Sequence, residues 1–425
     1  MKASIKLDHQ LVAIEGEHVV NAMLDLDAPA PDVNKERPPL HLALVIDRSG
    51  SMHGAKLENT KAAADYLIRR LEATDQMAIV AYDDEVDLVS SLAPVDRDHL
   101  RRAVHSISSG GMTNLSGGWL KGVEEVRRAP AGAPRKVILL TDGQANHGIT
   151  DSATLVGMAG KIAEEGVGTT TIGYGRDFHE QLLTQMADAG AGKSYFAANA
   201  EDAPGIFAAE FADLASLVAQ NVSLEIRPTE DVQLLGILNE YPTTAVVGGV
   251  QINLGDAYAE ENRRVVFQLH IPQMAALGVK KVADLLLRYV SVGDSVAAHE
   301  ITLPIVVNAV SADEAAGAAS DQDVLEEVLI LKAARGQKEA RDLADRGDFE
   351  AAQKLLRDSA DELRAIAPTS KRAQELFQEA DILDSHSSMA APGSYDALQS
   401  KTWHYDQHRK QRSRRRPPQD PDKQS

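Results

Sequence analysis

The chain has 425 residues, too many for one hydrophobic core, so we expect two or three domains. Its 44% hydrophobic and 25% charged residues are ordinary for a globular protein, and its net charge of −19 argues against nucleic-acid binding by the body of the protein. Cysteine is absent, which excludes a disulfide framework.

Targeting signals are also missing from the sequence. The first ten residues carry charges and lack the apolar segment of a signal peptide. No run of about 18 apolar residues exists that could form a membrane span. We therefore expect a cytoplasmic protein.

The N-terminal segment, residues 1–36, alternates weakly between apolar and polar residues. Residues 5–13 and 19–26 predict two strands, with a turn near Gly16. Prolines at positions 29, 31, 38 and 39 predict a linker after them. These strands have no partner of their own in this segment.

The most informative stretch of the chain is residues 42–52. Five consecutive apolar residues, 42–46, end at Asp47, and Ser49 and Ser51 follow at alternate positions. The apolar run predicts a buried strand of a parallel sheet, and the pattern after residue 54 predicts a helix. Ligands bind at such strand ends in open α/β sheets.

Two more polar residues occupy equivalent places downstream. Thr113 lies in a glycine-rich loop before a predicted helix, and Asp142 ends the apolar strand 137–141. Strand and helix patterns alternate across the region, which predicts a doubly wound, mostly parallel α/β sheet for residues 37–217. Carboxylate and hydroxyl oxygens suit Mg²⁺ or Mn²⁺ better than Ca²⁺. A helix N-cap is the alternative interpretation of the serines.

This pattern resembles a von Willebrand factor type A domain with a complete metal-ion-dependent adhesion site, of the kind found in intracellular bacterial proteins. The family pattern is Asp-x-Ser-x-Ser, then Thr, then Asp, and the chain fills it with Asp47, Ser49, Ser51, Thr113 and Asp142. The resemblance implies that hydroxyls bind the metal directly and that aspartates often bind it through water. It also implies that a partner protein supplies a carboxylate to the metal.

Residues 218–308 change to short strands separated by glycine turns, which predicts an antiparallel β-sandwich. We expect the N-terminal strands of residues 1–36 to complete this sandwich. The α/β domain would then be inserted into a β domain.

Residues 312–385 are rich in Ala, Glu, Leu, Lys and Arg at helical spacing and predict a helical bundle. Residues 340–356 resemble half of a tetratricopeptide unit, although any helical hairpin with a glycine turn would match. Residues 386–425 show no core-forming periodicity and predict a disordered tail. Its basic run at 409–416 could attract nucleic acid, anionic lipid or the acidic body of the protein, or remain solvated.

Three other features of the sequence have alternative interpretations as sites. Residues 191–194, Ala-Gly-Lys-Ser, end like a phosphate-binding loop, but Ala187 replaces the first glycine and the helix precedes the strand. His147 could lie near the metal rim, or it could be an exposed loop residue. The acidic run 83–85 could bind a second cation or form a solvated turn.

The sequence thus predicts a non-enzymatic interaction module or scaffold that binds a partner's Asp or Glu through a bound cation. An adaptor for a separate AAA+ ATPase, as in metal chelatases, is the alternative. A metal-dependent hydrolase is a third possibility, but it would need a general base near the metal, and the sequence offers no stronger candidate than His147.

Overall fold

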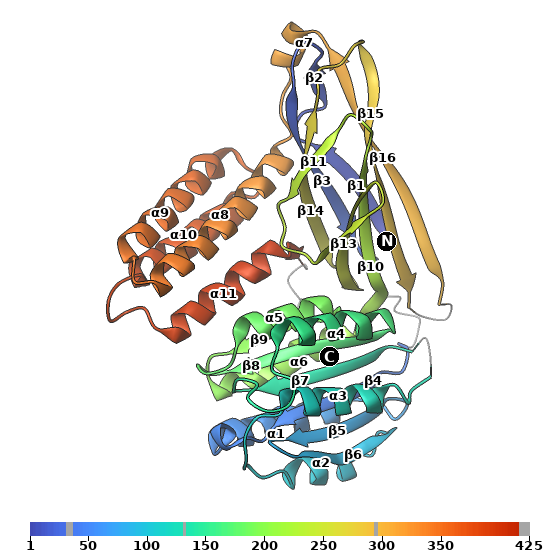
Figure 1. Ribbon diagram of the computed structural model, residues 1–425, viewed down its shortest axis with the longest axis vertical. Helices are drawn as coiled ribbons and strands as arrows, with labels where there is room; N and C mark the ends of the chain where they lie inside the picture. The colour runs from blue at the N-terminus through green and yellow to red at the C-terminus, as the bar shows by residue number, and fades with distance from the viewer. Residues whose placement is uncertain (31–36, 131–132, 293–295, 416–425) are drawn as a thin grey trace.

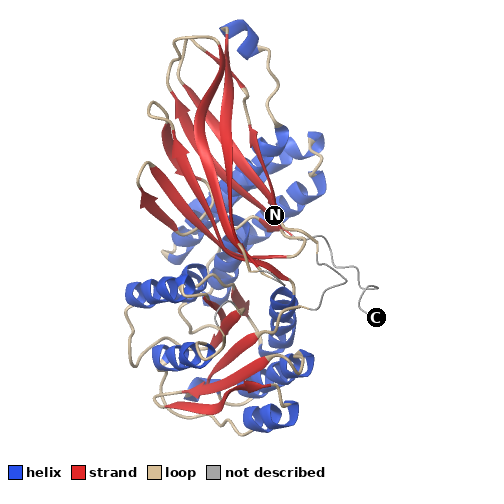
Figure 2. Ribbon diagram, turned by 90° about the vertical axis from the view of Figure 1, so that its right-hand side faces the viewer, coloured by secondary structure: helices blue, strands red, loops and turns tan. Residues whose placement is uncertain are grey.

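The computed structural model describes residues 1–30, 37–130, 133–292 and 296–415. An α/β domain, an antiparallel β part and a group of C-terminal helices make up this structure (Figure 1). The β part stands above the α/β domain in both views, with its strands running lengthwise (Figures 1 and 2).

The α/β domain is built on a six-stranded sheet in the order β6-β5-β4-β7-β8-β9. Its strands are β4 (His41–Asp47), β5 (Gln76–Tyr82), β6 (Val86–Pro94), β7 (Arg135–Thr141), β8 (Val167–Tyr174) and β9 (Ser194–Ala197). Only β6 runs antiparallel to its neighbour, β5. The carboxyl ends of the five parallel strands therefore lie at one edge of the sheet.

Helices cover both faces of this sheet. They are α1 (Ala55–Arg70), α2 (Arg97–His105), α3 (Leu115–Val126), α4 (Ser152–Glu164), α5 (Glu180–Ala189) and α6 (Ala203–Ala215). One core joins α1, α2 and α6 to one face, and a second core joins α3, α4 and α5 to the other. Burial on both faces explains why the central strands are continuous apolar runs rather than alternating ones.

The β part consists of two sheets that share one hydrophobic core. The first holds β1 (Lys2–Leu7), β3 (His18–Asp27), β14 (Asn262–Ile271), β11 (Gln233–Ile237) and β17 (Arg414–Arg415). The second holds β12 (Thr243–Val246), β13 (Gly249–Tyr258), β10 (Leu217–Pro228), β15 (Gly278–Ser291), β16 (Ala298–Val310) and β2 (Leu11–Ala13). All pairings are antiparallel except that of β2 with β16.

The N-terminal strands belong to this β part. Strand β3 lies between β1 and β14, and its register with β14 runs from His18 opposite Ile271 to Asp27 opposite Asn262. The chain then leaves to form the whole α/β domain and returns at β10. The α/β domain is thus an insertion between two strands of the β part.

Deleting residues 1–27 should therefore unfold the β part. The deletion removes β3 from the middle of a sheet, exposes the edge of β14 and opens the shared core, where Leu24 is fully buried. Thermal unfolding should lose its cooperative transition for this part. Deleting residues 1–7 is the matched control, since it removes only the edge strand β1. Equal melting temperatures for the two deletions would show that β3 is dispensable.

The C-terminal helices are α7 (Ala312–Ala316), α8 (Gln322–Asp345), α9 (Phe349–Ile366), α10 (Ala373–Met389) and α11 (Ala397–Gln411). Val324, Val328 and Leu331 of α8 pack on Met23 and Val266 of the first sheet, on the side away from the shared core. Helices α8, α9 and α10 form a bundle with its own core. None of the helices in the described residues is long and apolar enough to cross a membrane.

The predicted disorder of residues 386–425 is wrong as far as Arg415. Helix α10 continues to Met389, α11 follows, and β17 pairs with β14. The fully buried Trp403 anchors α11 in the bundle core, where it stacks on His386. The sequence pattern missed this helix because, apart from Trp403 and Tyr405, its contacts are made mostly by polar and charged side chains, which leave no apolar periodicity. Residues 416–425, the end of the predicted tail, lie outside the described residues.

Candidate metal centre

The five residues predicted from the sequence lie at the carboxyl edge of the α/β sheet. Asp47 is the last residue of β4, and Asp142 directly follows β7, the strand that pairs with β4. Ser49 and Ser51 follow β4 in the loop that leads to α1. Thr113 precedes α3. Adjacent parallel strands that end at the same level place the two aspartates side by side.

Hydrogen bonds link these residues into one group. The Ser51 hydroxyl donates to Asp142 Oδ1 at 2.6 Å, and the Ser49 and Ser51 hydroxyl oxygens are 3.2 Å apart. The Ser49 amide donates to Asp47 Oδ1 at 2.8 Å. The structure therefore brings two carboxylates and two hydroxyls together within hydrogen-bond distance of one another.

The fifth residue, Thr113, lies beside the same group, as its distance from Gly143 shows. A Cβ atom at Gly143 would lie 3.2 Å from Thr113 Oγ1 and 3.9 Å from Ser51 Oγ. Both hydroxyls therefore face the same small space above the end of β7. A side chain at position 143 would extend into that space, and its Cβ alone would make a tight contact with the Thr113 hydroxyl.

The surrounding loops are fixed by backbone and side-chain hydrogen bonds. The Thr113 amide donates to Asn146 Oδ1 at 2.9 Å, and the Gly50 amide donates to the Gly111 carbonyl at 3.1 Å. Asp83 pairs with Arg48 at 3.1 Å and so supports the loop after β4. That pairing favours the structural interpretation of the acidic run 83–85 over a second cation site.

The two aspartates differ in their counter-charges. Both side chains are fully buried. Asp142 forms an ion pair with Lys56, at the start of α1. Asp47 accepts hydrogen bonds from the Ser49 amide and from the Thr141 hydroxyl at 2.6 Å, and no described cationic side chain contacts it. Burial raises the pKa of Asp47 to about 6, although these hydrogen bonds oppose the rise.

This donor set suits a hard divalent cation. A buried carboxylate without a counter-charge is costly, and a cation next to Asp47 would remove that cost. In the described residues no group of three or more His, Cys, Asp or Glu could hold a metal, so a closed cage of charged ligands is absent there. Two carboxylates and three hydroxyls instead match Mg²⁺ or Mn²⁺, which retain water ligands.

The sequence did not single out Thr141 or Lys56. Thr141 is the last residue of β7 and looks like any strand residue, yet its hydroxyl holds Asp47. Lys56 follows Ser51 by five positions in the first turn of α1, where a lysine is normally a surface residue. The side chain of His147 is exposed, and the backbone amide of His147 donates a hydrogen bond to the Thr113 carbonyl at 3.2 Å.

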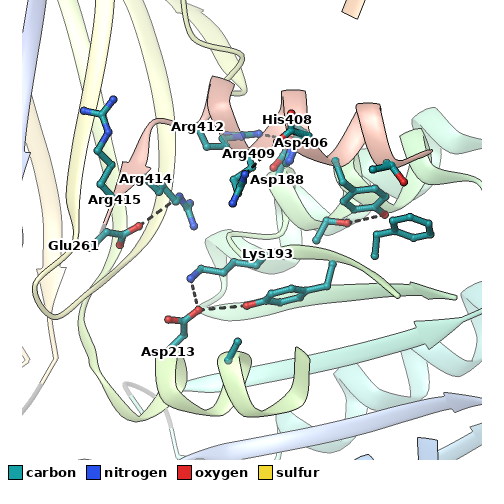
Figure 3. A pocket seen from close by; sticks show the side chains of 17 residues that line it. Asp188, Lys193, Asp213, Glu261, Asp406, His408, Arg409, Arg412, Arg414 and Arg415 are labelled. Atoms are coloured by element: carbon teal, nitrogen blue, oxygen red, sulfur yellow. Dashed lines mark hydrogen bonds and ion pairs between the residues drawn. The ribbon is translucent and has the colours of Figure 1, made fainter. Parts of the chain in front are cut away.

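A cavity of about 590 Å³ lies elsewhere, between α11, β9 and the β part (Figure 3). Arginines from the C-terminal segment and Lys193 surround it, and each is paired with a carboxylate. The pairs are Lys193 with Asp213, Arg412 with Asp188, Arg414 with Glu261, and Arg409 with Asp406. The Arg412–Asp188 pair joins the C-terminal segment to the α/β domain, and the Arg414–Glu261 pair joins it to the β part. Lys193 is thus paired with Asp213. This pairing agrees with the interpretation that residues 191–194 do not form a phosphate-binding loop.

Comparisons with known proteins agree with the α/β fold of this domain. Residues 41–209 match the family model described as von Willebrand factor type A domain. An uncharacterized protein of Synechocystis sp. is 25% identical over 348 residues, which cover 78% of this chain and 80% of that protein. The uncharacterized protein YfbK of Escherichia coli is 27% identical over 209 residues, or 48% of this chain, and only 36% of its own length is matched.

The fold of the whole chain also has a counterpart of known structure. The solved structure described as von Willebrand factor type A from Catenulispora acidiphila superimposes with a TM-score of 0.72. The match covers 98% of this chain and 97% of that chain at 16% identity. The family match and this superposition confirm the predicted α/β fold, and the low identity restricts the second comparison to the fold.

Proposed function

We propose that this chain, whose residues 41–209 form a von Willebrand factor type A domain, binds a partner protein through a divalent cation. The cation, Mg²⁺ or Mn²⁺, would be held by Asp47, Ser49, Ser51, Thr113 and Asp142. The group supplied by the partner would be the carboxylate of an Asp or Glu. The β part and the C-terminal helices would serve as the scaffold that carries this domain.

The observation that carries the proposal is the isolation of the Asp47 carboxylate. Its side chain is fully buried, its hydrogen-bond donors are neutral, and no cationic side chain among the described residues reaches it. Buried carboxylates in folded proteins are normally paired or bound to metal. A divalent cation supplies the charge that Asp47 lacks.

The exposure of the ligands explains why the cation would face a partner. The two aspartates are buried beneath the site, whereas Ser51 is exposed to solvent. A cation held by neutral hydroxyls on its outer side remains electrophilic. It can therefore exchange a water ligand for an oxygen from outside, and a carboxylate is the protein group best suited to replace that water.

We propose a binding role rather than a catalytic one. A metal-dependent hydrolase needs a general base beside the metal. His147 was the candidate, and its described contact is made by its backbone amide, not by its imidazole. Ser49 and Ser51 point their hydroxyls at each other and at Asp142, as ligands would, and no histidine is hydrogen-bonded to either in the described residues.

The test is affinity capture by the full chain in Mg²⁺ and in EDTA, with Thr113→Val as the matched variant. Valine keeps the size of the side chain. The hydrogen bond from the Thr113 backbone amide to Asn146 does not involve the hydroxyl and should remain. We expect a partner that wild type retains in Mg²⁺ and releases in EDTA, and that Thr113→Val retains at least about tenfold less well.

Replacing the partner's contacting Asp or Glu by the amide should abolish the same binding. Capture that is equal in Mg²⁺ and EDTA, or equal for wild type and Thr113→Val, would contradict cation-mediated binding.

A further inference from the structure

Lys56 brings a fixed positive charge to the edge of the candidate metal centre. It is the second residue of α1, and its ammonium pairs with Asp142 Oδ2. The Lys56 side chain is 32% exposed, whereas Asp142 is fully buried. A Cβ atom at Gly175, just after β8, would lie 3.7 Å from the ammonium, so this loop lies close over Lys56. The ammonium is thus held in place between α1 and the ends of β7 and β8.

The two oxygens of Asp142 serve different partners. Oδ1 accepts the Ser51 hydroxyl on the side of the other predicted ligands, and Oδ2 faces Lys56. Lys56 can therefore stay paired with Asp142 while the hydroxyl side holds a cation. Asp47 has no such counter-charge, so Lys56 neutralises only half of the negative charge of the site.

The balance of charges then depends on Lys56. The two carboxylates and the ammonium together carry one negative charge, and a divalent cation converts this to one positive charge. A single incoming carboxylate neutralises that remaining charge. Without Lys56, the loaded site would already be neutral and would attract an anion less strongly.

We propose that Lys56 is a built-in counter-charge that weakens the hold of the site on the cation and makes the loaded site selective for a monoanionic carboxylate. This inference rests on the proposed function, because it assigns to Lys56 the charge that attracts the partner. Lys56 contacts neither the cation nor the partner in this scheme. It acts through the field of its ammonium and through Asp142.

The first test compares Lys56→Met, which keeps the length but removes the charge, with Lys56→Arg, which keeps the charge. Calorimetric titration of the full chain with Mg²⁺ should show about tenfold tighter binding for Lys56→Met than for wild type. A gain of this size corresponds to the repulsion expected between the ammonium and the cation even in a water-like dielectric. Because the repulsion scales with the charge of the ion, Lys56→Met should bind Tb³⁺ about thirtyfold more tightly than wild type does, as measured by Tb³⁺ luminescence. Lys56→Arg should bind both ions like wild type.

The second test measures the anion. Acetate should displace water from the Mn²⁺-loaded protein, read as a change in water proton relaxation, and Lys56→Met should need at least about threefold more acetate than wild type. Unchanged affinities for Mg²⁺ and Tb³⁺ in Lys56→Met would overturn the inference. So would weaker metal binding that Lys56→Arg restores, since Lys56 would then only orient Asp142. Wild type that binds no metal at all would instead overturn the proposed function itself.

Discussion

Truncation after Gly393 should lower the free energy of unfolding by more than about 5 kcal/mol, or abolish folding. The truncation removes α11 and β17, which join the α/β domain, the β part and the helical bundle (Figure 1). It empties the position of Trp403, which is fully buried in the bundle core. Loss of one such aromatic side chain alone costs about 3 to 5 kcal/mol.

The same truncation removes both cations that pair with Asp188 and one of the cations that pair with Glu327. Burial alone would raise the pKa of Asp188, but Arg412 and His408 bring it down to about 2. The pKa of Glu327, which has no exposed surface, is likewise held at about 2 against burial by Arg415 and Arg372. The truncation removes Arg415 but leaves Arg372 in contact with Glu327. Removing one partner of a buried ion pair costs about 3 to 5 kcal/mol, because the other charge stays in the interior.

The measurement is thermal and urea unfolding of the truncated chain, with truncation after Arg415 as the control. The control keeps every contact described for α11 and β17. It should melt like the full chain. If the chain ending at Gly393 melts within a few degrees of the full chain, the ion pairs around Asp188 and Glu327 contribute little and the C-terminal segment is only an appendage.

The sequence was most informative where local pattern and chemistry coincide. The apolar run before Asp47 predicted a buried strand, and the run before Asp142 predicted another. Because adjacent parallel strands end at one edge, Asp47 and Asp142 were expected side by side. The resemblance to the von Willebrand factor type A pattern added Ser49, Ser51 and Thr113 to them. The inserted α/β domain could also be anticipated, because the N-terminal strands had no partner within their own segment.

Sequence reasoning failed where a residue's role depends on a distant charge. The basic residues 409–415 allowed several interpretations, and one of them, attraction to the acidic body of the protein, agrees with the structure. Their partners could not be named, because Arg412 and Arg415 meet Asp188 and Glu327, which no local pattern connects to them. Lys56 was passed over for the same reason. Only the fold shows that the first turn of α1 stands beside the end of β7.

The second large effect is expected at the proposed cation site. Asp47→Asn should weaken Mg²⁺ and Mn²⁺ binding at least about 100-fold, because it removes a charge as well as a ligand from the buried side of the site. Wild type at a metal concentration of about 100 times its dissociation constant should gain about 2.7 kcal/mol of stability, and the variant should gain almost none. Calorimetric titration and melting scans measure these two quantities.

Melting in EDTA separates a metal ligand from a structural carboxylate. Without metal, the buried charge of Asp47 is a cost, since only neutral donors reach it, so Asp47→Asn should melt at or above the temperature of wild type. Ser49→Ala is the matched control, because it removes a ligand oxygen but no charge, and it should weaken metal binding less than Asp47→Asn. If Asp47→Asn melts lower than wild type in EDTA and wild type does not respond to millimolar metal, then Asp47 serves to cap the loop after β4. The stabilising partner of Asp47 would then be the Thr141 hydroxyl and not a cation.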